Sequence, residues 1–280
     1  MSNIQEDHST ELYDFVKRLR PDASHNRRDI IHPYEIDIIV DNVAIEYCGL
    51  FWHSEMKKAK LYHRAKHDMC KEKGIRLIQI FEDEWINNKE LIKQKIKNIL
   101  KLNDSDRIYA RRCKIEEVGI EAKAAFFNTN HIQGNGPSSI NYGLMHNEAL
   151  VACIGFIKNN DGSYTLNRYA TSCSVIGGFS KLLNHFERIY NKPKIITFAD
   201  LRWSDGELYY KTGFKLDKIL EPDYFWVKHN QRFHKFNFRH SGGLRRLEHY
   251  DSSLSEAENM RNHGFFKIYD AGKLRFFKNI

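Results

Sequence analysis

The chain has 280 residues, of which 41% are hydrophobic and 29% charged, the balance of a folded globular protein long enough for two domains. Its formal net charge of +8 suggests a polyanionic partner. Five scattered cysteines without a CxxC pair argue against a disulfide framework or a zinc knuckle, and no apolar run reaches the ~18 residues of a membrane span.

The first predicted element is a helix over residues 10–19, where apolar residues recur at helical spacing before Pro21. Glu11 lies in its first turn, either as an acid favoured by the helix dipole or as part of a site. The polar stretch Asn26-Arg27-Arg28 is predicted as a loop before the first strand. It is either a solvated basic turn or a phosphate contact.

Residues 34–47 predict a β-hairpin. Apolar and acidic residues alternate from Tyr34 to Asp41, the pair Asp41-Asn42 forms a polar turn, and an apolar run follows from Val43. Asp37 and Glu46 then lie on neighbouring strands, where both carboxylates reach one divalent ion.

The combined string IEYCGLFWHSE (45–55), YH (62–63), CKEKGIRLI (70–78) and FEDEW (81–85) resembles the nuclease core of the Vsr-type mismatch endonucleases. More closely, it is similar to the EDxHD homing endonucleases of phages, within the PD-(D/E)XK superfamily. The resemblance implies an N-terminal α/β core with a mixed sheet flanked by helices. It also implies an endodeoxyribonuclease that hydrolyses phosphodiester bonds with Mg²⁺ or Mn²⁺.

The same resemblance implies roles for individual residues. Asp37 coordinates the metal directly, with Glu46 and the backbone carbonyl of Tyr47 as further ligands, and Glu11 helps to order the metal site. His53 activates water or protonates the leaving 3′ oxygen, and His63 either polarises His53 or contacts phosphate. A structural role is the alternative for each histidine.

One position departs from the superfamily motif. Where a lysine follows the acid by two residues, this chain has Cys48. A buried neutral thiol cannot replace an ammonium in balancing phosphate charge. In the Vsr-like branch, histidine takes over that task.

Trp52 and the helix predicted over residues 62–73 complete this region. Trp52 is either a core residue or a wedge that stacks on bases. Basic residues surround the helix and form either a phosphate-binding face or a solvated one: Lys57, Lys58, Lys60, Arg64 and Lys66. A buried strand over 75–81 and a helix reaching residue 102 lead to the polar cluster 103–106, which predicts a domain boundary.

Residues 105–228 predict a second domain. Its order is a helix (121–129), three strands (140–144, 149–157, 164–170), a helix (178–190), a strand (194–199) and the closing segment YYKTGF (209–214). This order resembles the GNAT acyltransferase fold. The place of the pyrophosphate loop, Ser174 to Lys181, has glycines but lacks the leading basic or amide residue, so we do not expect acyl-CoA as a partner.

The third segment, residues 229–280, is predicted as a basic extension that alternates basic and aromatic residues and ends in a helix (253–262) and a hairpin (265–277). With this extension we expect double-stranded DNA as the partner. The candidate contacts, each alternatively a surface charge or packing residue, are Arg27, Arg28, Trp52, Arg64, Arg111, Arg112, Arg202, Arg232, Lys235, Arg239, Arg245 and Arg246.

These patterns predict an α/β protein with a nuclease domain (1–104), a GNAT-like, DNA-binding domain (105–228) and a basic extension (229–280). The predicted function is a site-specific DNA endonuclease of a phage or mobile element. Three alternatives stay open: a mismatch-type nicking repair enzyme, a GNAT-type acyltransferase fused to a nuclease-like domain, and a catalytically silent DNA-binding protein. The polar N-terminus and unpaired cysteines predict the cytoplasm.

Overall fold

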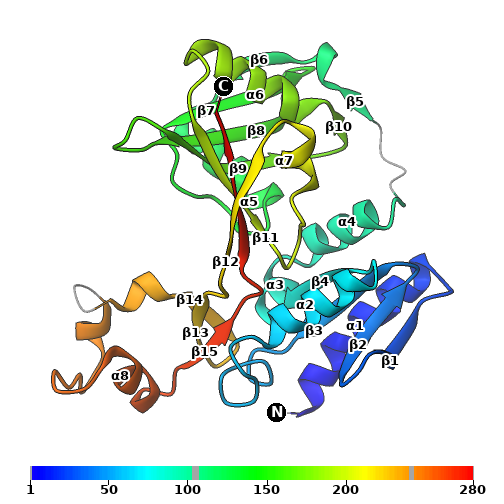
Figure 1. The fold of residues 1–280 in the computed structure, drawn as a ribbon, viewed down its shortest axis with the longest axis vertical. Coiled ribbons are helices and arrows are strands. Elements are labelled where there is room, and N and C mark those ends of the chain that lie inside the picture. Colours follow the sequence, from blue (N-terminus) through cyan, green and yellow to red (C-terminus); the bar gives the residue numbers. More distant parts are fainter. Residues whose placement is uncertain (1, 103–106, 240–242, 280) are drawn as a thin grey trace. The chain divides into compact units, whose positions relative to one another are not determined.

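The computed structural model describes residues 2–102, 107–239 and 243–279, with only the helical backbone for residues 2–7 (Figure 1). The chain forms two compact units. Unit 1 comprises residues 1–89, 200–204 and 220–273, and unit 2 comprises residues 90–199, 205–219 and 274–280. The predicted boundary at residue 104 falls outside the described residues, and the three-domain division stays a prediction.

Unit 1 is built on a four-stranded sheet in the order β1-β2-β3-β4: β1 (Ser24–Ile31), β2 (Tyr34–Val40), β3 (Val43–Cys48) and β4 (Arg76–Phe81). The first three strands are antiparallel, whereas β3 and β4 run parallel. The predicted hairpin is confirmed, with Ile38 opposite Ile45 and Val40 opposite Val43. Arg27 and Arg28, which we placed in a loop, lie in β1, because backbone pairing with β2 extends a strand that has little apolar patterning.

Three helices belong to this part of unit 1: α1 (Ser2–Leu19), α2 (Tyr62–Glu72) and α3 (Glu82–Asn87). The next helix, α4 (Lys89–Ile99), belongs to unit 2 from Glu90 onward. The helices predicted before Pro21 and over 62–73 are confirmed. Helix α1 buries Leu12 and Val16, and α3 buries Trp85 completely. These apolar contacts fix both helices to the unit.

The C-terminal part of unit 1 is a three-stranded sheet in the order β14-β13-β15: β13 (Tyr224–Lys228), β14 (Gln231–His234) and β15 (Phe266–Tyr269). Helix α8 (Glu256–Asn262) and the short turns η2 (Lys235–Phe238) and η3 (Gly243–Arg246) adjoin it. Trp226, Leu244 and Met260 form its core. The predicted hairpin over 265–277 is wrong, because β15 and the last strand, β16, pair in different sheets.

Unit 2 is built on a seven-stranded sheet in the order β12-β16-β11-β9-β8-β7-β6. Its strands are β6 (Lys114–Glu117), β7 (Ile140–His146), β8 (Ala149–Lys158), β9 (Tyr164–Thr171), β11 (Ile195–Asp200), β12 (Lys215–Leu220) and β16 (Lys273–Lys278). Strands β6 to β9 form an antiparallel meander, and β11 runs parallel to β9. The strands and helices predicted for this region are confirmed.

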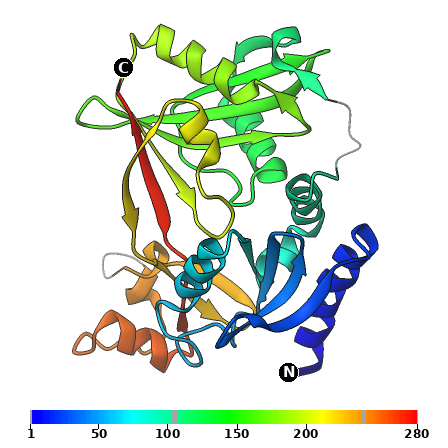
Figure 2. The same ribbon diagram turned by 45° about the vertical axis from the view of Figure 1, so that its right-hand side comes forward.

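Helices α5 (Ile120–Asn130) and α6 (Gly178–Ile189) cover opposite faces of the sheet (Figures 1 and 2). On β9, Tyr169 contacts Phe179 of α6, whereas its neighbour Ala170 packs in the α5 cluster. Successive side chains of a strand point to opposite faces, so the two helices enclose the sheet. The short elements β5 (Ile108–Tyr109), η1 (Ala110–Arg112), β10 (Val175–Ile176) and α7 (Glu207–Lys211) complete the unit.

The chain therefore has a mixed α/β fold. Among the helices of the described residues, none combines the length and the apolar character needed to cross a membrane.

Candidate functional sites

An acid pair, the half-buried Asp37 and the buried Glu46, lies in the β2–β3 hairpin of unit 1. The hairpin register places Asp37 opposite Glu46, and the backbone N–H of Tyr47 donates to Asp37 Oδ2 over 2.8 Å. Burial raises the pKa of Asp37 well above its usual value, and the neighbouring Glu46 charge adds to the rise. Burial also raises the pKa of Glu46. The structure thus brings together the two carboxylates that the sequence predicted on neighbouring strands.

Lys66 is the residue of this cluster that sequence reasoning missed. We placed it on a basic helix face, yet its side chain is 1% exposed and forms an ion pair with Glu46, which is 3% exposed. Burial lowers the pKa of Lys66, but Glu46 and Asp37 outweigh burial and raise it overall. The helical spacing could have indicated that Lys66 is buried. It lies three residues after His63 and four before Cys70, on the face of α2 that is buried.

His53 and His63 form a second pair beside the acids. His63 Nδ1 lies 2.6 Å from the carbonyl oxygen of Tyr269, which only accepts, so this nitrogen carries the proton. His63 Nε2 then accepts from His53 Nδ1 over 2.8 Å. Burial lowers the pKa of His63 to about 3 and that of His53 well below its usual value, so both imidazoles are neutral at pH 7.

Glu11 and Tyr47 both have hydrogen-bond partners within the protein. The Glu11 carboxylate accepts from Lys89 Nζ at 2.7 and 2.8 Å and from Trp85 Nε1 at 3.1 Å. These contacts hold α1 against the segment that follows β4. Tyr47 contributes its backbone N–H to Asp37, and its side chain is buried.

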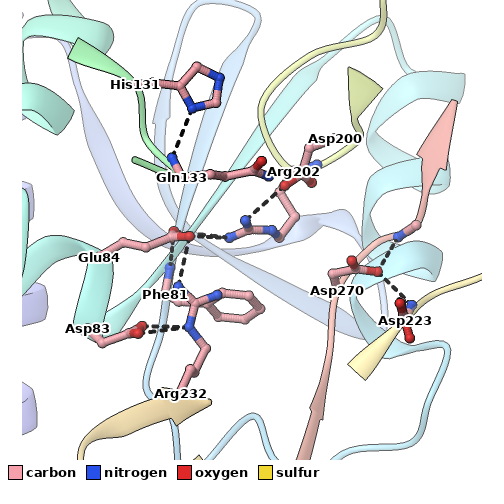
Figure 3. A network of polar contacts seen from close by, with 11 residues as sticks. Phe81, Asp83, Glu84, His131, Gln133, Asp200, Arg202, Asp223, Arg232 and Asp270 are labelled. Atoms are coloured by element: carbon pink, nitrogen blue, oxygen red, sulfur yellow. Dashed lines mark hydrogen bonds and ion pairs between the residues drawn. The ribbon is translucent and has the colours of Figure 1, made fainter. Parts of the chain in front are cut away.

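Arg202 and Arg232, both predicted to contact DNA, lie in an internal ion-pair network of unit 1 (Figure 3). Arg202 donates to Glu84 at 3.0 Å and to Asp200 at 2.9 Å, and its side chain is 2% exposed. Arg232 donates to Asp83 and to Glu84. Their charges are therefore neutralised inside the protein and are not available to phosphate.

Most of the other predicted contacts also have partners within the chain. Four are paired with carboxylates: Arg27 with Asp29, Arg28 with Glu35, Arg64 with Asp68 and Lys235 with Asp223. Two lie over aromatic rings: Arg111 over Tyr109 and Arg239 over Phe236. Trp52 is 49% exposed beside Lys57, and the three remaining candidates are exposed as well: Arg112, Arg245 and Arg246.

The sheet of unit 2 opens between the parallel strands β9 and β11. They pair at Tyr164–Ile195 and Thr165–Ile196, and beyond these pairs Thr197 Oγ1 donates to the Leu166 carbonyl over 3.1 Å. Thr197 also hydrogen-bonds the Tyr209 side chain, and Arg168 of β9 lies close enough for its charge to act on Tyr209. Burial raises the pKa of Tyr209, so its hydroxyl stays protonated at neutral pH.

A cavity of about 840 Å³ lies in unit 2 along α6, from its cap at Gly177 to Arg188 in its last turn. Its lining includes three cationic side chains, Arg111, Lys181 and Arg188, and no acidic residue. Gly177 also lines it, in the left-handed conformation (φ 75°) that caps α6. Lys181 Nζ is held by the carbonyls of Ala110 and Cys113 at 2.9 and 2.6 Å. The cavity lining therefore carries positive and no negative side-chain charge.

Comparison with solved structures finds acetyltransferases. An acetyltransferase from Bacillus subtilis in complex with CoA and a GNAT family acetyltransferase from Elizabethkingia anophelis with acetyl-CoA bound each align at 12% identity and a TM-score of 0.35. An IAA acetyltransferase from Bacillus cereus aligns at 10% identity and 0.33. Each alignment covers 60% of this chain and 99% of the other. No protein-family model matches the chain, and no curated protein does.

These comparisons correct several predictions. The structures found are acetyltransferases and not PD-(D/E)XK nucleases, so the predicted family, the endodeoxyribonuclease activity and the phage homing function are wrong. Three further predictions are wrong: the Mg²⁺ or Mn²⁺ cofactor, the DNA partner and the exclusion of acyl-CoA. The solved structures found contain CoA or acetyl-CoA instead. In the structure Glu46 pairs with Lys66, a partner that the sequence analysis did not predict.

Proposed function

We propose that unit 2 is a GNAT-type acyltransferase that binds acyl-CoA. The similarities to solved structures are distant, so the proposal rests on the geometry of this chain. The observation that carries it is the cationic cavity beside α6. Its volume of about 840 Å³ suits a nucleotide-sized ligand.

The cavity residues fit the phosphate groups of CoA. Arg111 and Arg188 are exposed at the cavity and supply guanidinium groups, which match phosphate geometry. The position of a Cβ on Gly177 is 3.9 Å from Ala110 Cβ, so the backbone at the helix cap is open to a ligand. The helix dipole of α6, a 12-residue helix, adds to the attraction.

The α6 terminus has one amide that is already used. The Tyr169 hydroxyl accepts from the backbone N–H of Phe179, in the first turn of the helix. The arginine side chains therefore take the larger part in holding phosphate. With phosphate held mainly by arginine side chains, the Ser174–Lys181 loop does not need the leading basic or amide residue to bind an anion.

Acyl-CoA supplies a thioester whose acyl group is passed to a nucleophilic acceptor. In this chain the Tyr209 hydroxyl, which hydrogen-bonds Thr197, is the group to which we assign proton donation to the departing thiolate. The positive charge of Arg168 nearby favours the charge that Tyr209 gains when it loses that proton.

The test is isothermal titration calorimetry of the full chain with CoA. Arg111→Ala and Arg188→Ala each remove one charge-assisted contact, worth about 1.5–3 kcal/mol, and should weaken binding about ten- to a hundred-fold. Arg112→Ala is the matched control, because Arg112 is exposed beside Arg111 but does not line the cavity. Tyr209→Phe should bind CoA like the parent and lose acyl transfer. Absence of CoA binding to the parent would refute the proposal.

A further inference from the structure

Three potential metal ligands meet in unit 1, outside the site proposed above. The Cys48 Sγ atom and one imidazole nitrogen each from His53 and His63 all lie within 4.8 Å of one another. They come from different elements: Cys48 ends β3, His53 lies in the loop that follows, and His63 begins α2. The tertiary fold thus brings three soft or borderline metal ligands close together.

The imidazole of His63 is oriented for ligation by a contact behind it. Its Nδ1–H donates to the Tyr269 carbonyl at 2.6 Å, which fixes the ring and leaves the Nε2 lone pair directed at the cluster. Metal-bound histidines typically hold their second nitrogen in this way. The ring of His53 stacks on that of His63, with centroids 5.0 Å apart and planes inclined by 15°. The 2.8 Å contact between His53 Nδ1 and His63 Nε2 brings one nitrogen of each ring to the same space.

We propose that Cys48, His53 and His63 bind one zinc-class transition-metal ion. Zinc takes nitrogen ligands at about 2.0–2.1 Å and sulfur at about 2.3 Å, so two nitrogens on a tetrahedral ion lie about 3.3 Å apart. The present distance of 2.8 Å between His53 Nδ1 and His63 Nε2 widens to that value by a small rotation of the half-exposed His53. Binding releases the thiol proton of Cys48 to solvent and moves the His53 proton from Nδ1 to Nε2.

The surroundings favour this ion at the thiol rather than at the acids. Glu46 already pairs with the Lys66 ammonium, and Asp37 accepts from the Tyr47 backbone. Three protein ligands leave a fourth tetrahedral position open, as in sites that bind water or a substrate. Thiolate and imidazole select zinc, cobalt or copper over magnesium or calcium.

The test uses Co²⁺ as the probe, because it occupies zinc sites and reports its ligands optically. The chelator-treated full chain, titrated with Co²⁺, should show a thiolate-to-cobalt charge-transfer band that saturates at one ion per chain, and Zn²⁺ should abolish it. Cys48→Ala should remove that band. His53→Ala, at a half-exposed position, should lower Co²⁺ affinity without disturbing the core.

The matched control is Cys70→Ala, since Cys70 is as fully buried as Cys48 but lies outside the cluster. It should keep the band. Tryptophan emission verifies the fold of each variant, because all four tryptophans lie in unit 1. The proposal is overturned if saturating Co²⁺ gives the parent no thiolate band, or if Cys48→Ala retains it. Cobalt bound at Asp37 and Glu46 alone would lack the band and count against the proposal.

Discussion

Replacing Lys66 by methionine should destabilise unit 1 in a way that depends on pH. The substitution keeps the length and apolar stem of the side chain but removes the ammonium that pairs with Glu46. Both side chains are at most 3% exposed, so the carboxylate loses its partner in a site that water does not reach. Of the described atoms, none hydrogen-bonds Glu46 Oε2 even in the parent. Breaking such a buried pair costs about 3–5 kcal/mol.

The pH dependence follows from the raised pKa of the two acids. Burial raises the folded pKa of Asp37 and of Glu46, and the charge of Lys66 opposes that rise. Without Lys66 both values rise further. An acid whose pKa is raised in the folded state stabilises that state at low pH, where it is protonated. This stabilisation is lost as pH rises through the folded pKa. The deficit of Lys66→Met should therefore be largest near pH 8 and shrink toward pH 5.

Urea unfolding followed by tryptophan fluorescence measures this deficit, because every tryptophan lies in unit 1. Lys71→Met, at an exposed position of the same helix, should change the free energy of unfolding by less than about 0.5 kcal/mol. Adding Glu46→Gln to Lys66→Met should recover part of the loss, since the unpaired charge is then absent. A deficit below about 1 kcal/mol, or one equal at both pH values, would refute the reasoning.

Two further substitutions test the cores of the units. Glu84→Gln should cost about 3–5 kcal/mol at neutral pH, because Glu84 is buried between Arg202 and Arg232. Burial raises the pKa of Glu84, but the two arginines outweigh burial and lower it. The stabilisation that ionised Glu84 gives is therefore present above its unfolded pKa and lost as pH falls through its folded pKa. If the variant unfolded in acid at the same midpoint as the parent, this reasoning would be contradicted. Phe186→Ala removes the ring whose centroid lies 3.7 Å from that of Phe156, and it should lower the free energy of unfolding by about 3–5 kcal/mol. Far-ultraviolet circular dichroism measures this loss, because unit 2 has no tryptophan. A loss under about 1 kcal/mol would show that the site repacks.

Local elements of this chain were predictable from the sequence. The β2–β3 hairpin follows from alternation on both sides of Asp41-Asn42, and α6 from apolar residues at helical spacing after two glycines. These signals are local, since they depend on neighbours within a few residues. The pairing of Asp37 with Glu46 across the hairpin is predictable for the same reason.

The family assignment was wrong because it predicted an activity from the similarity of short residue strings. The string around Glu46 and His53 predicted a metal-bound acid pair and exposed arginines, whereas Lys66 pairs with Glu46 and Arg202 is buried against Glu84. Residue type shows that a side chain is charged. It does not show which opposite charge the fold brings beside it, because that partner lies 20 residues away in one case and 118 in the other.

The sequence by itself therefore determined the periodic helices and strands, because their side-chain spacing is set by the geometry of each element. Only the tertiary structure decided which charges are neutralised and which ligands converge. The C-terminal strand β15 belongs to unit 1 and provides the Tyr269 carbonyl that orients His63, while β16 enters the sheet of unit 2. Such long-range contacts arise from burial of apolar surface over the whole unit, which no short stretch of sequence encodes.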